Sequence, residues 1–461
     1  MQTRFQPAQL LDPDVAASEQ ILRKCVHCGF CIATCPTYVL LGDELDGPRG
    51  RIYLIKDMLE SGRPATAAVV PHLDRCLSCL ACMTTCPSGV HYQHLIDHAR
   101  VHVERTYRRP WHERVLRASL ISILPYPGRL RFALAAARLA RGLARLLPHG
   151  VATLATRALP SRLAARLQAL VRLSAYRAPR FARDDDACGR SRAAVEPGAA
   201  ASPGPHGTQR GRVALLAGCA QSVLTPQAQA SSVRLLERAG FEVVVIEGCC
   251  GALVHHMGKA ARNRALAAQL IGRIEAERRR GGLDAVVVTA SGCGTHLKDY
   301  GYLFRDEASL ARAAAATSDS TRDITEWLHE CGWSAQEGRP APDLTVAYHS
   351  ACSMQHGQRL GRIPQSLLER AGFRVVEIPE GHLCCGSAGT YNILEPEIAA
   401  QLRDRKLANI RRTSVRVVAT GNVGCCVQLA GAPDLQIVHT AQLLDWAQGG
   451  PAPVTVRGRN G

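Results

Sequence analysis

The sequence of 461 residues lacks any long apolar run without charged residues. A membrane-spanning helix needs about 20 consecutive, mostly apolar residues. The most apolar stretch, residues 116–147, is interrupted by arginines, among them Arg129, Arg131, Arg138, Arg141 and Arg145. Residues 1–20 contain acidic residues and have neither an apolar segment nor a twin-arginine pair. We therefore expect no export signal, no transmembrane helix and a cytoplasmic location.

Acidic residues are almost missing from residues 100–183, which hold eighteen arginines but only Glu104 and Glu113. Nearly all of the formal net charge of +17 comes from this segment. Such a distribution disfavours binding of nucleic acid over a wide surface, and we expect no nucleic-acid partner. Arg138, Arg141 and Arg145 follow helical spacing, so this helix could rest on an anionic membrane surface near a quinone pool. Alternatively, it presents a solvated or partner-docking face.

Complete nucleotide-binding and catalytic motifs are also missing. The glycines at 248–251 and 386–389 do not complete a dinucleotide fingerprint after a strand. No Ser-His-Asp arrangement and no paired carboxylates stand out in the sequence. We expect no catalytic residue in this chain, and we assign any chemistry at a C–H bond to a partner.

Composition predicts a folded, multidomain protein. Hydrophobic residues make up 46% of the chain and charged residues 21%, which is ordinary for globular proteins. At roughly 150 residues per domain, this length accommodates about three domains. We expect a helical ferredoxin-like domain (1–107), a basic helical connector (108–183), a flexible linker (184–211) and two α/β domains (212–342 and 343–461).

Two cysteine runs share the spacing Cys-x2-Cys-x2-Cys-x3-Cys-Pro. In bacterial ferredoxins, the first three cysteines of such a run hold one [4Fe-4S] cluster and the fourth holds the neighbouring cluster. Zinc needs only two Cys-x2-Cys pairs, so a zinc site leaves the third cysteine and the Cys-Pro pair unexplained. We predict two clusters with exchanged ligands, the first on Cys25, Cys28, Cys31 and Cys86 and the second on Cys76, Cys79, Cys82 and Cys35.

The later half of the chain repeats itself, because LLERAGFEVV at 235–244 returns as LLERAGFRVV at 367–376. Each copy shows the order strand, helix, strand, helix, strand, which predicts a parallel sheet. The expected strands are 213–217, 242–246 and 284–289 in the first copy, and 344–348, 374–378 and 415–419 in the second.

Four cysteines follow the strand ends in each copy. They are Cys219, Cys249, Cys250 and Cys293 in the first copy, and Cys352, Cys384, Cys385 and Cys425 in the second. Because parallel strands end at a common edge, we expect each set to converge. Buried, inert cysteine is the simple alternative, but recurrence in both copies favours a function. Each copy could hold a further iron–sulfur or metal site, both could share one, or the thiols could be redox and quinone-facing sites.

Cys-Cys-Gly repeats behind two ferredoxin-type runs resemble the iron–sulfur subunits of glycolate oxidase over nearly the whole chain. The stretches 382–391 (HLCCGSAGTY) and 290–294 (ASGCG) carry the similarity to these subunits among relatives that serve lactate or glycerol 3-phosphate. The resemblance implies a glycolate dehydrogenase complex in which a partner subunit with FAD oxidises glycolate to glyoxylate. This chain would pass the electrons to a quinone or another acceptor, either in the cytoplasm or peripherally on the inner membrane face.

Alternative functions are an equivalent subunit for lactate or glycerol 3-phosphate, or a nucleic-acid-binding iron–sulfur protein. Relatives similar to heterodisulfide reductase carry a fifth cysteine three residues after the fourth in each repeat. His296 and Gln428 occupy these positions here, so a cluster of that type would lack one ligand per repeat. His296 could replace a ligand, although a lone histidine after a strand is more often a packed residue. The sequence assigns no role to Cys426, Cys188 or Cys331.

Overall fold

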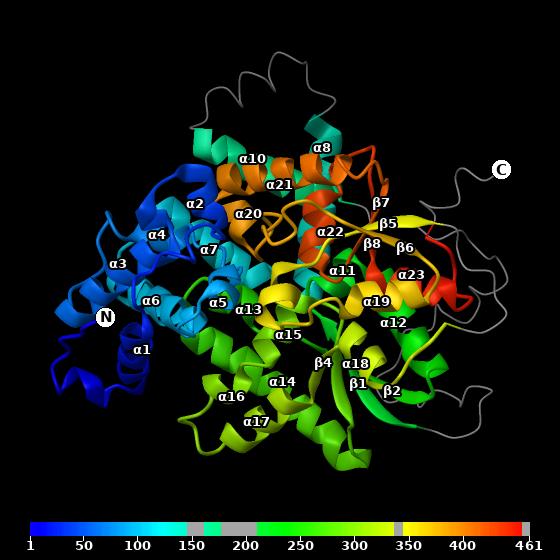
Figure 1. Ribbon diagram of the computed structural model, residues 1–461, viewed down its shortest axis with the longest axis horizontal. Coiled ribbons are helices and arrows are strands. Elements are labelled where there is room, and N and C mark those ends of the chain that lie inside the picture. Colours follow the sequence, from blue (N-terminus) through cyan, green and yellow to red (C-terminus); the bar gives the residue numbers. More distant parts are fainter. Residues whose placement is uncertain (145–160, 177–209, 336–343, 454–461) are drawn as a thin grey trace.

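The computed structural model describes residues 1–144, 161–176, 210–335 and 344–453 (Figure 1). Within these ranges, the N-terminal part is helical and the later part contains two parallel sheets with helices around them. The expected mixed architecture is therefore confirmed. The expected linker, 184–211, lies outside the described residues except for its last two positions.

The N-terminal helices begin at well-defined sequence signals. They are α1 (Pro13–Lys24), α2 (Pro36–Leu41), α3 (Pro48–Ser61), α4 (Val70–Asp74), α5 (Ala81–Thr85) and α6 (Tyr92–Thr106). Proline opens α1, α2 and α3, and the Asp12 side chain caps α1 by accepting backbone N–H groups. Cys35 immediately precedes α2, so the Cys-Pro pair fixes a sulfur at the start of a helix. The apolar faces meet around Leu22, Ile55 and Leu95, which are fully buried.

The connector contributes α7 (Trp111–Ile123), α8 (Pro127–Ala144) and α10 (Ser161–Ala175). Its arginines bind groups of the protein itself. Arg109 precedes α7, and both it and Arg117 are buried and pair with Asp74 of α4, with 3.3 Å between Arg117 Nη2 and Asp74 Oδ2. Arg166 of α10 donates to the Leu394 carbonyl at 3.1 Å. Part of the arginine enrichment therefore serves internal packing.

Helix α8 is the segment for which the sequence predicts an amphipathic surface. Arg138 Nε donates to the Ser174 carbonyl at 3.1 Å, whereas the Arg141 side chain and Arg145 lie outside what the structure describes. Phe132 and Leu139 are 78% and 67% exposed. None of the described helices combines the length and apolar character that crossing a bilayer requires.

Two four-stranded parallel sheets form the later part of the described chain. The first contains β1 (Gly211–Gly218), β2 (Phe241–Gly248), β3 (Ala285–Val288) and β4 (Thr321–Asp323), and the second contains β5 (Thr345–Tyr348), β6 (Arg374–Glu377), β7 (Val417–Thr420) and β8 (Gln436–His439). Their orders, β2-β1-β3-β4 and β6-β5-β7-β8, match position by position. We call these units the first repeat (210–335) and the second repeat (344–453).

Helices surround each sheet. The first repeat has α11 (Gln221–Leu224), α12 (Pro226–Arg238), α13 (Ala252–His255), α14 (Ala260–Gly281), α15 (Ser291–Leu297), α16 (Tyr300–Leu303), α17 (Ala311–Ser320) and α18 (Ile324–Glu330). The second has α19 (Ile363–Arg370), α20 (Tyr391–Leu394), α21 (Pro396–Arg411), α22 (Val423–Leu429) and α23 (Thr440–Ala447).

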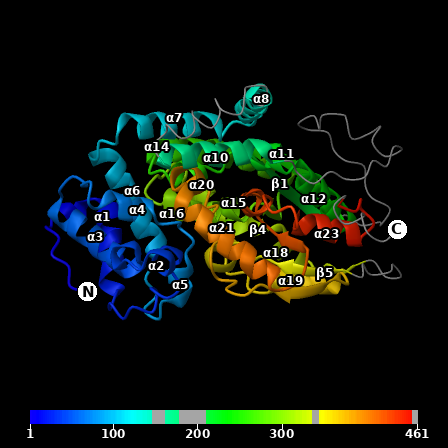
Figure 2. The same ribbon diagram turned by 90° about the horizontal axis from the view of Figure 1, so that it is seen from above.

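The two repeats pack against each other through two reciprocal helix pairs. Helix α12 contacts α23, and α18 contacts α19, as Figures 1 and 2 show. Side chains from both repeats share one apolar core. Arg234 and Arg238 of α12 pair with the fully buried Asp445 of α23, at 2.9 Å for Arg238. The duplication is therefore visible in three dimensions as two related halves with a common core.

Candidate metal centres

Cysteines of the first run line a cavity, and one cysteine of the second run lines it too. Cys25, Cys28 and Cys31 line it from the segment between α1 and α2, and Cys86 lines it from the end of α5. Gly29 has a φ of 86°, a left-handed conformation that helps this short segment turn its sulfurs inward. Burial, followed by the nearby Cys25 and Cys86, raises the pKa of Cys31 to about 11. A bound cation would be needed to hold such thiols as thiolates.

The second run opens on a cavity lined by Cys76, Cys79 and Cys82, and Cys35 from the first run lines it too. Cys82 borders both cavities. The fourth cysteine of each run thus lies with the first three of the other run. This is the grouping that exchanged ligation requires, and ligation itself stays a prediction.

Arg51 is a buried cation beside the second cavity. Arg51 is only 1% exposed. Its Nη1 lies 3.8 Å from Cys35 Sγ, and its Nη2 lies 3.0 Å from Thr37 Oγ1. Burial lowers the pKa of Arg51, but the surrounding negative groups, Cys76 first, raise the pKa overall. A guanidinium at this place offsets part of the negative charge that several thiolates would bring.

Glycine completes each Cys-Cys-Gly motif because the backbone leaves no room for a side chain. Gly251 has a φ of +89°, and a Cβ there would lie 2.2 Å from Asn263 Oδ1. Gly386 has a φ of +84°, and a Cβ would lie 2.5 Å from the Ala399 carbonyl oxygen. Each glycine N–H donates to the sulfur of the first cysteine of its motif at 3.4 Å. The motif therefore shapes a sulfur-binding turn after a strand.

The first repeat gathers its four cysteines into two thiol pairs at the carboxyl end of the sheet. Cys219 follows β1 and pairs with Cys249, while Cys250 follows β2 and pairs with Cys293 of α15. The hydrogen bond to Cys249, followed by burial, raises the pKa of Cys219, and the same bond lowers the pKa of Cys249. Cys249 is thus the more thiolate-like of that pair.

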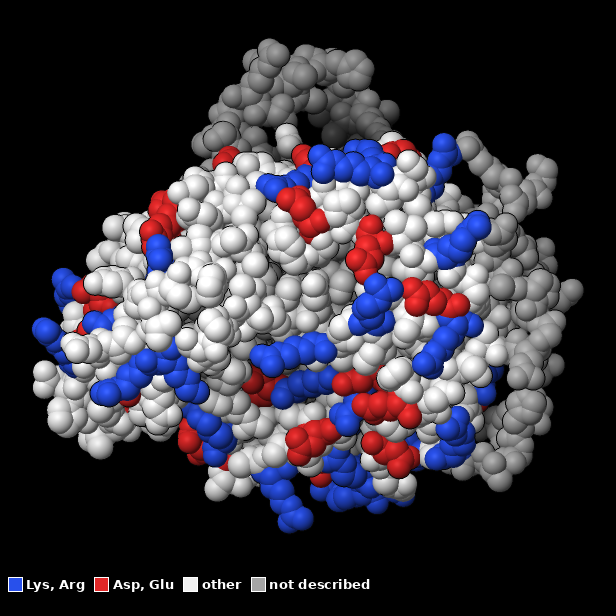
Figure 3. Space-filling view, in the orientation of Figure 1, with Lys and Arg blue, Asp and Glu red and all other residues white. Residues whose placement is uncertain are grey.

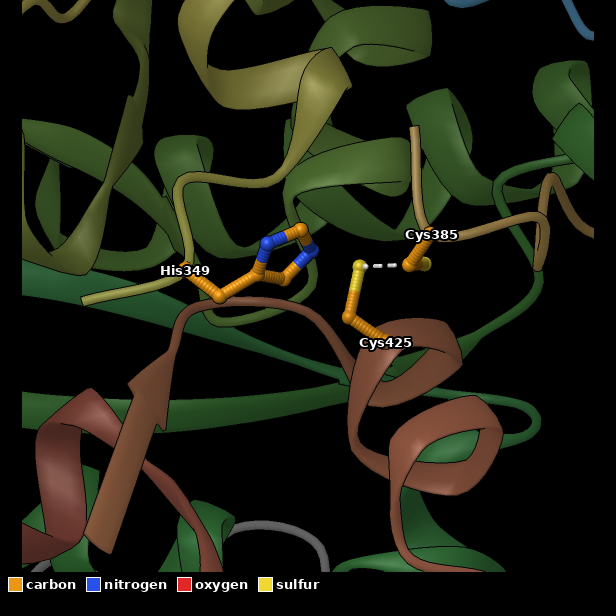
Figure 4. Close-up of side chains that lie close together, drawn as sticks. All are labelled: His349, Cys385 and Cys425. Atoms are coloured by element: carbon orange, nitrogen blue, oxygen red, sulfur yellow. Dashed lines mark hydrogen bonds between the residues drawn. The ribbon is translucent and has the colours of Figure 1, made fainter. Parts of the chain in front are cut away.

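The second repeat instead arranges its sulfurs in one continuous chain. Cys352 Sγ lies 3.8 Å from Cys384 Sγ, and Cys385 Sγ lies 3.4 Å from Cys425 Sγ. A hydrogen bond between the thiols of Cys384 and Cys385 joins the two pairs. The sequence prediction missed His349, whose imidazole lies beside Cys385 and Cys425 (Figure 4). Its signal was its position directly after β5, at the same sheet edge. Burial lowers the pKa of His349 to about 3, so the imidazole is neutral near pH 7.

The positions of the missing fifth cysteines hold hydrogen-bonded side chains. His296 Nε2 lies 2.9 Å from Asn263 Oδ1. Gln428 donates to the Ala399 carbonyl at 3.1 Å and accepts from Asn392. Both side chains therefore serve packing rather than replacing a sulfur ligand.

Three cysteines had no assigned role in the sequence. Cys426 is buried in the apolar core of the second repeat, and Cys331 packs at the edge of the shared core. Cys188 lies outside the described residues. Packing accounts for the first two.

Known families match the chain where the cysteines gather. A 4Fe-4S dicluster domain matches residues 24–90, and a cysteine-rich domain matches residues 213–298 and again 346–430. The glycolate oxidase iron-sulfur subunit of Escherichia coli (strain K12) is 38% identical over 453 residues, covering 97% of this chain and 99% of that protein. The chain belongs to the family of glycolate oxidase iron–sulfur subunits.

Other members and relatives of this family are similar over different lengths. The probable glycolate oxidase iron-sulfur subunit of Bacillus subtilis (strain 168) is 30% identical over 93% of this chain and 94% of that protein. Lactate utilization protein A of Bacillus licheniformis is 26% identical over 51% of this chain and 99% of that protein. The resemblance seen in the sequence is thus confirmed.

Proposed function

We propose that this chain is the electron-transfer subunit of a flavin-dependent glycolate dehydrogenase. The crossed grouping of eight cysteines in two adjacent cavities is the observation that carries this proposal. Two [4Fe-4S] clusters bound there would supply single-electron transfer. A partner subunit with FAD would oxidise glycolate to glyoxylate, and a quinone or another acceptor would receive the electrons.

The cysteines of the two cavities differ in their exposure to solvent. Cys28 at the first cavity is exposed, and the adjacent Val26 and Phe30 are 66% and 64% exposed. Cys79 at the second cavity is 8% exposed and packs in an apolar cluster with Cys384 of the second repeat. These contacts support docking of the flavin subunit at the first cavity, because exposed apolar side chains there can exclude water around a sulfur ligand.

Helices α7 and α8 support a peripheral position on the inner face of the cytoplasmic membrane. They lie along the same edge of the molecule (Figure 2) and carry Trp111, Phe132 and Leu139, which are 75%, 78% and 67% exposed. Aromatic and leucine side chains combined with arginines are typical of helices that bind membrane surfaces. On the face in Figure 3, by contrast, basic and acidic side chains are interspersed. That face gives no support to nucleic-acid binding.

Assays of the chain with and without its flavin partner test the proposal. We expect the complex to reduce a dye with glycolate faster than with lactate or glycerol 3-phosphate, and the isolated chain to show no turnover. Glycolate oxidation by the flavin-free chain alone would contradict the proposal. A complex that prefers lactate would instead indicate a role in lactate utilization, the function in the name of the relatives that match about half of this chain.

A further inference from the structure

We propose that the second repeat binds one thiophilic metal ion, zinc or iron, through Cys385, Cys425 and His349. A nitrogen of the imidazole and the two sulfurs all lie within 4.8 Å of one another. The three residues are 1%, 2% and 2% exposed, and the imidazole faces the Cys425 sulfur in Figure 4. Donors bound at about 2.0 to 2.3 Å from one ion have such mutual spacing. Metal binding at this place does not depend on the proposed function.

The imidazole lacks the partner that its burial demands. His349 Nε2 has no hydrogen-bond partner among the described residues. Buried polar atoms in folded proteins are nearly always paired. A metal ion beside two cysteine sulfurs would satisfy this nitrogen, because a neutral imidazole and thiolates together suit tetrahedral zinc or iron.

A buried ammonium group provides the charge balance that thiolates require. Lys406 is 1% exposed, and its Nζ donates to the Glu380 carbonyl at 2.8 Å. Besides the Glu380 carboxylate, the groups whose negative charge would act on this ammonium are the thiols of Cys385, Cys384 and Cys425. A buried lysine is costly without negative neighbours. Thiolates around a bound ion would supply them.

The first repeat lacks both features. At the offset of 133 residues that relates Cys219 to Cys352, Leu216 occupies the place of His349. Asn263 and Ala399 lie against the matching glycines Gly251 and Gly386. Seven residues further along each helix, the buried Leu270 of α14 occupies the place of Lys406 of α21. The ion therefore belongs to the second repeat, and the first repeat serves as an internal reference.

Cys384 would offer its sulfur as the fourth ligand of a tetrahedral ion, because its thiol is hydrogen-bonded to that of Cys385. It also packs in one apolar cluster with Cys79. The ion would thus lie next to the second ferredoxin-type cavity, on the wall between the N-terminal helices and the second repeat.

The test compares the metal content of the full chain after anaerobic reconstitution with iron and sulfide. His349→Leu copies the first repeat, and Cys426→Ala removes a neighbouring buried thiol as the control. We expect His349→Leu to lose one zinc or iron ion per chain relative to the wild type. The control should keep it, and the EPR signals of the ferredoxin-type clusters should persist in both variants. Elemental analysis identifies which metal is bound.

Equal metal content in the wild type and His349→Leu would overturn the proposal. If His349→Leu does not fold, His349→Cys decides. We expect this variant to keep the ion and, with Co²⁺ as the probe, to show stronger sulfur-to-metal absorption than the wild type. Loss of the ion, or an unchanged Co²⁺ spectrum, would count against His349 as a ligand.

Discussion

The two repeats have the same sheet order and the same Cys-Cys-Gly turn, yet their cysteine sites differ. The first repeat holds two thiol pairs, and Leu216 lies in the same apolar cluster as Cys250. The second holds a continuous chain of sulfurs beside His349 and Lys406. The duplicated scaffold preserved the turn that presents sulfurs, while the surrounding side chains changed. Fold similarity within one chain therefore does not imply equal chemistry at the matched positions.

The repeats also attach differently to the N-terminal helices. The first repeat contacts them through charged pairs, with 2.9 Å between His255 Nε2 and Asp97 Oδ2. The second repeat uses an apolar cluster with Cys79 and the hydrogen bond from the Tyr391 hydroxyl to the Arg75 carbonyl, at 3.0 Å. Within the part of the chain that the structure describes, only the second attachment brings a cysteine of a repeat against a cysteine of the ferredoxin-type runs. This difference predicts unequal roles for the two repeats.

Removing the sulfur at that attachment should have the largest effect. We expect Cys384→Ser to lower acceptor reduction by the complex about tenfold or more, as loss of a ligand does at metal sites. Cys249→Ser, the matched change in the first repeat, should have a smaller effect. Steady-state dye and quinone reduction measure both variants, with EPR to check the ferredoxin-type clusters. Equal losses of acceptor reduction in the two variants would contradict unequal roles of the two repeats.

The glycines of the two turns should differ in how well they tolerate alanine. Gly386→Ala places a Cβ against the backbone oxygen of Ala399, which cannot move aside. We expect a loss in the free energy of unfolding of about 2 to 4 kcal/mol, from the left-handed φ and the overlap together. Gly251→Ala meets mainly the Asn263 side chain and should cost less. Urea denaturation measures both, and a larger loss for Gly251→Ala would reverse the order.

The charged attachment of the first repeat should depend on pH. Burial lowers the pKa of His255, but Asp97 raises the pKa overall. Because the folded-state pKa is raised, the stabilisation is complete below the unfolded pKa of about 6.5 and is lost as the pH rises through the folded value. The ionisable groups facing His255 are Asp97, Arg100, His256, His296 and Asp299. We expect His255→Gln to cost about 1 to 2 kcal/mol near pH 6 and less near pH 9.

His356→Gln in the second repeat is the matched control. His356 Nδ1 lies 2.8 Å from Thr84 Oγ1, and burial lowers its pKa. Its contribution should therefore fall as the pH decreases, opposite to that of His255. Thermal unfolding of both variants between pH 5 and 9, in steps of about one unit, measures the two trends. The same trend in both would show that the attachments are electrostatically alike.

The sequence predicts the repeats well because their signals are local. Three strands of each sheet follow from apolar runs, whereas β4 and β8 were missed because they are short and include polar residues such as Arg322 and Gln436. Identical spacing in the two runs predicts the grouping of Cys35 with Cys76. Position alone could not distinguish His349 from an ordinary packed histidine, because its role depends on Cys385 and Cys425 arriving from distant strands.

The contacts between the N-terminal helices and the rest of the chain could not be predicted from the sequence either. The contact of Cys79 with the second repeat depends on how whole domains dock, which no spacing in the sequence records. The same holds for Arg109 and Arg117, which the sequence placed in a basic segment and the structure places in buried pairs with Asp74.

EPR of the Cys35→Ser variant after anaerobic reconstitution tests the exchanged ligation most directly. Cys35 belongs to the first run in sequence but lines the second cavity. We expect its spectrum to match that of Cys79→Ser and to differ from that of Cys28→Ser, with Cys331→Ser unchanged as the control. A Cys35→Ser spectrum that instead matches Cys28→Ser, or a wild-type preparation that binds only zinc, would contradict the account.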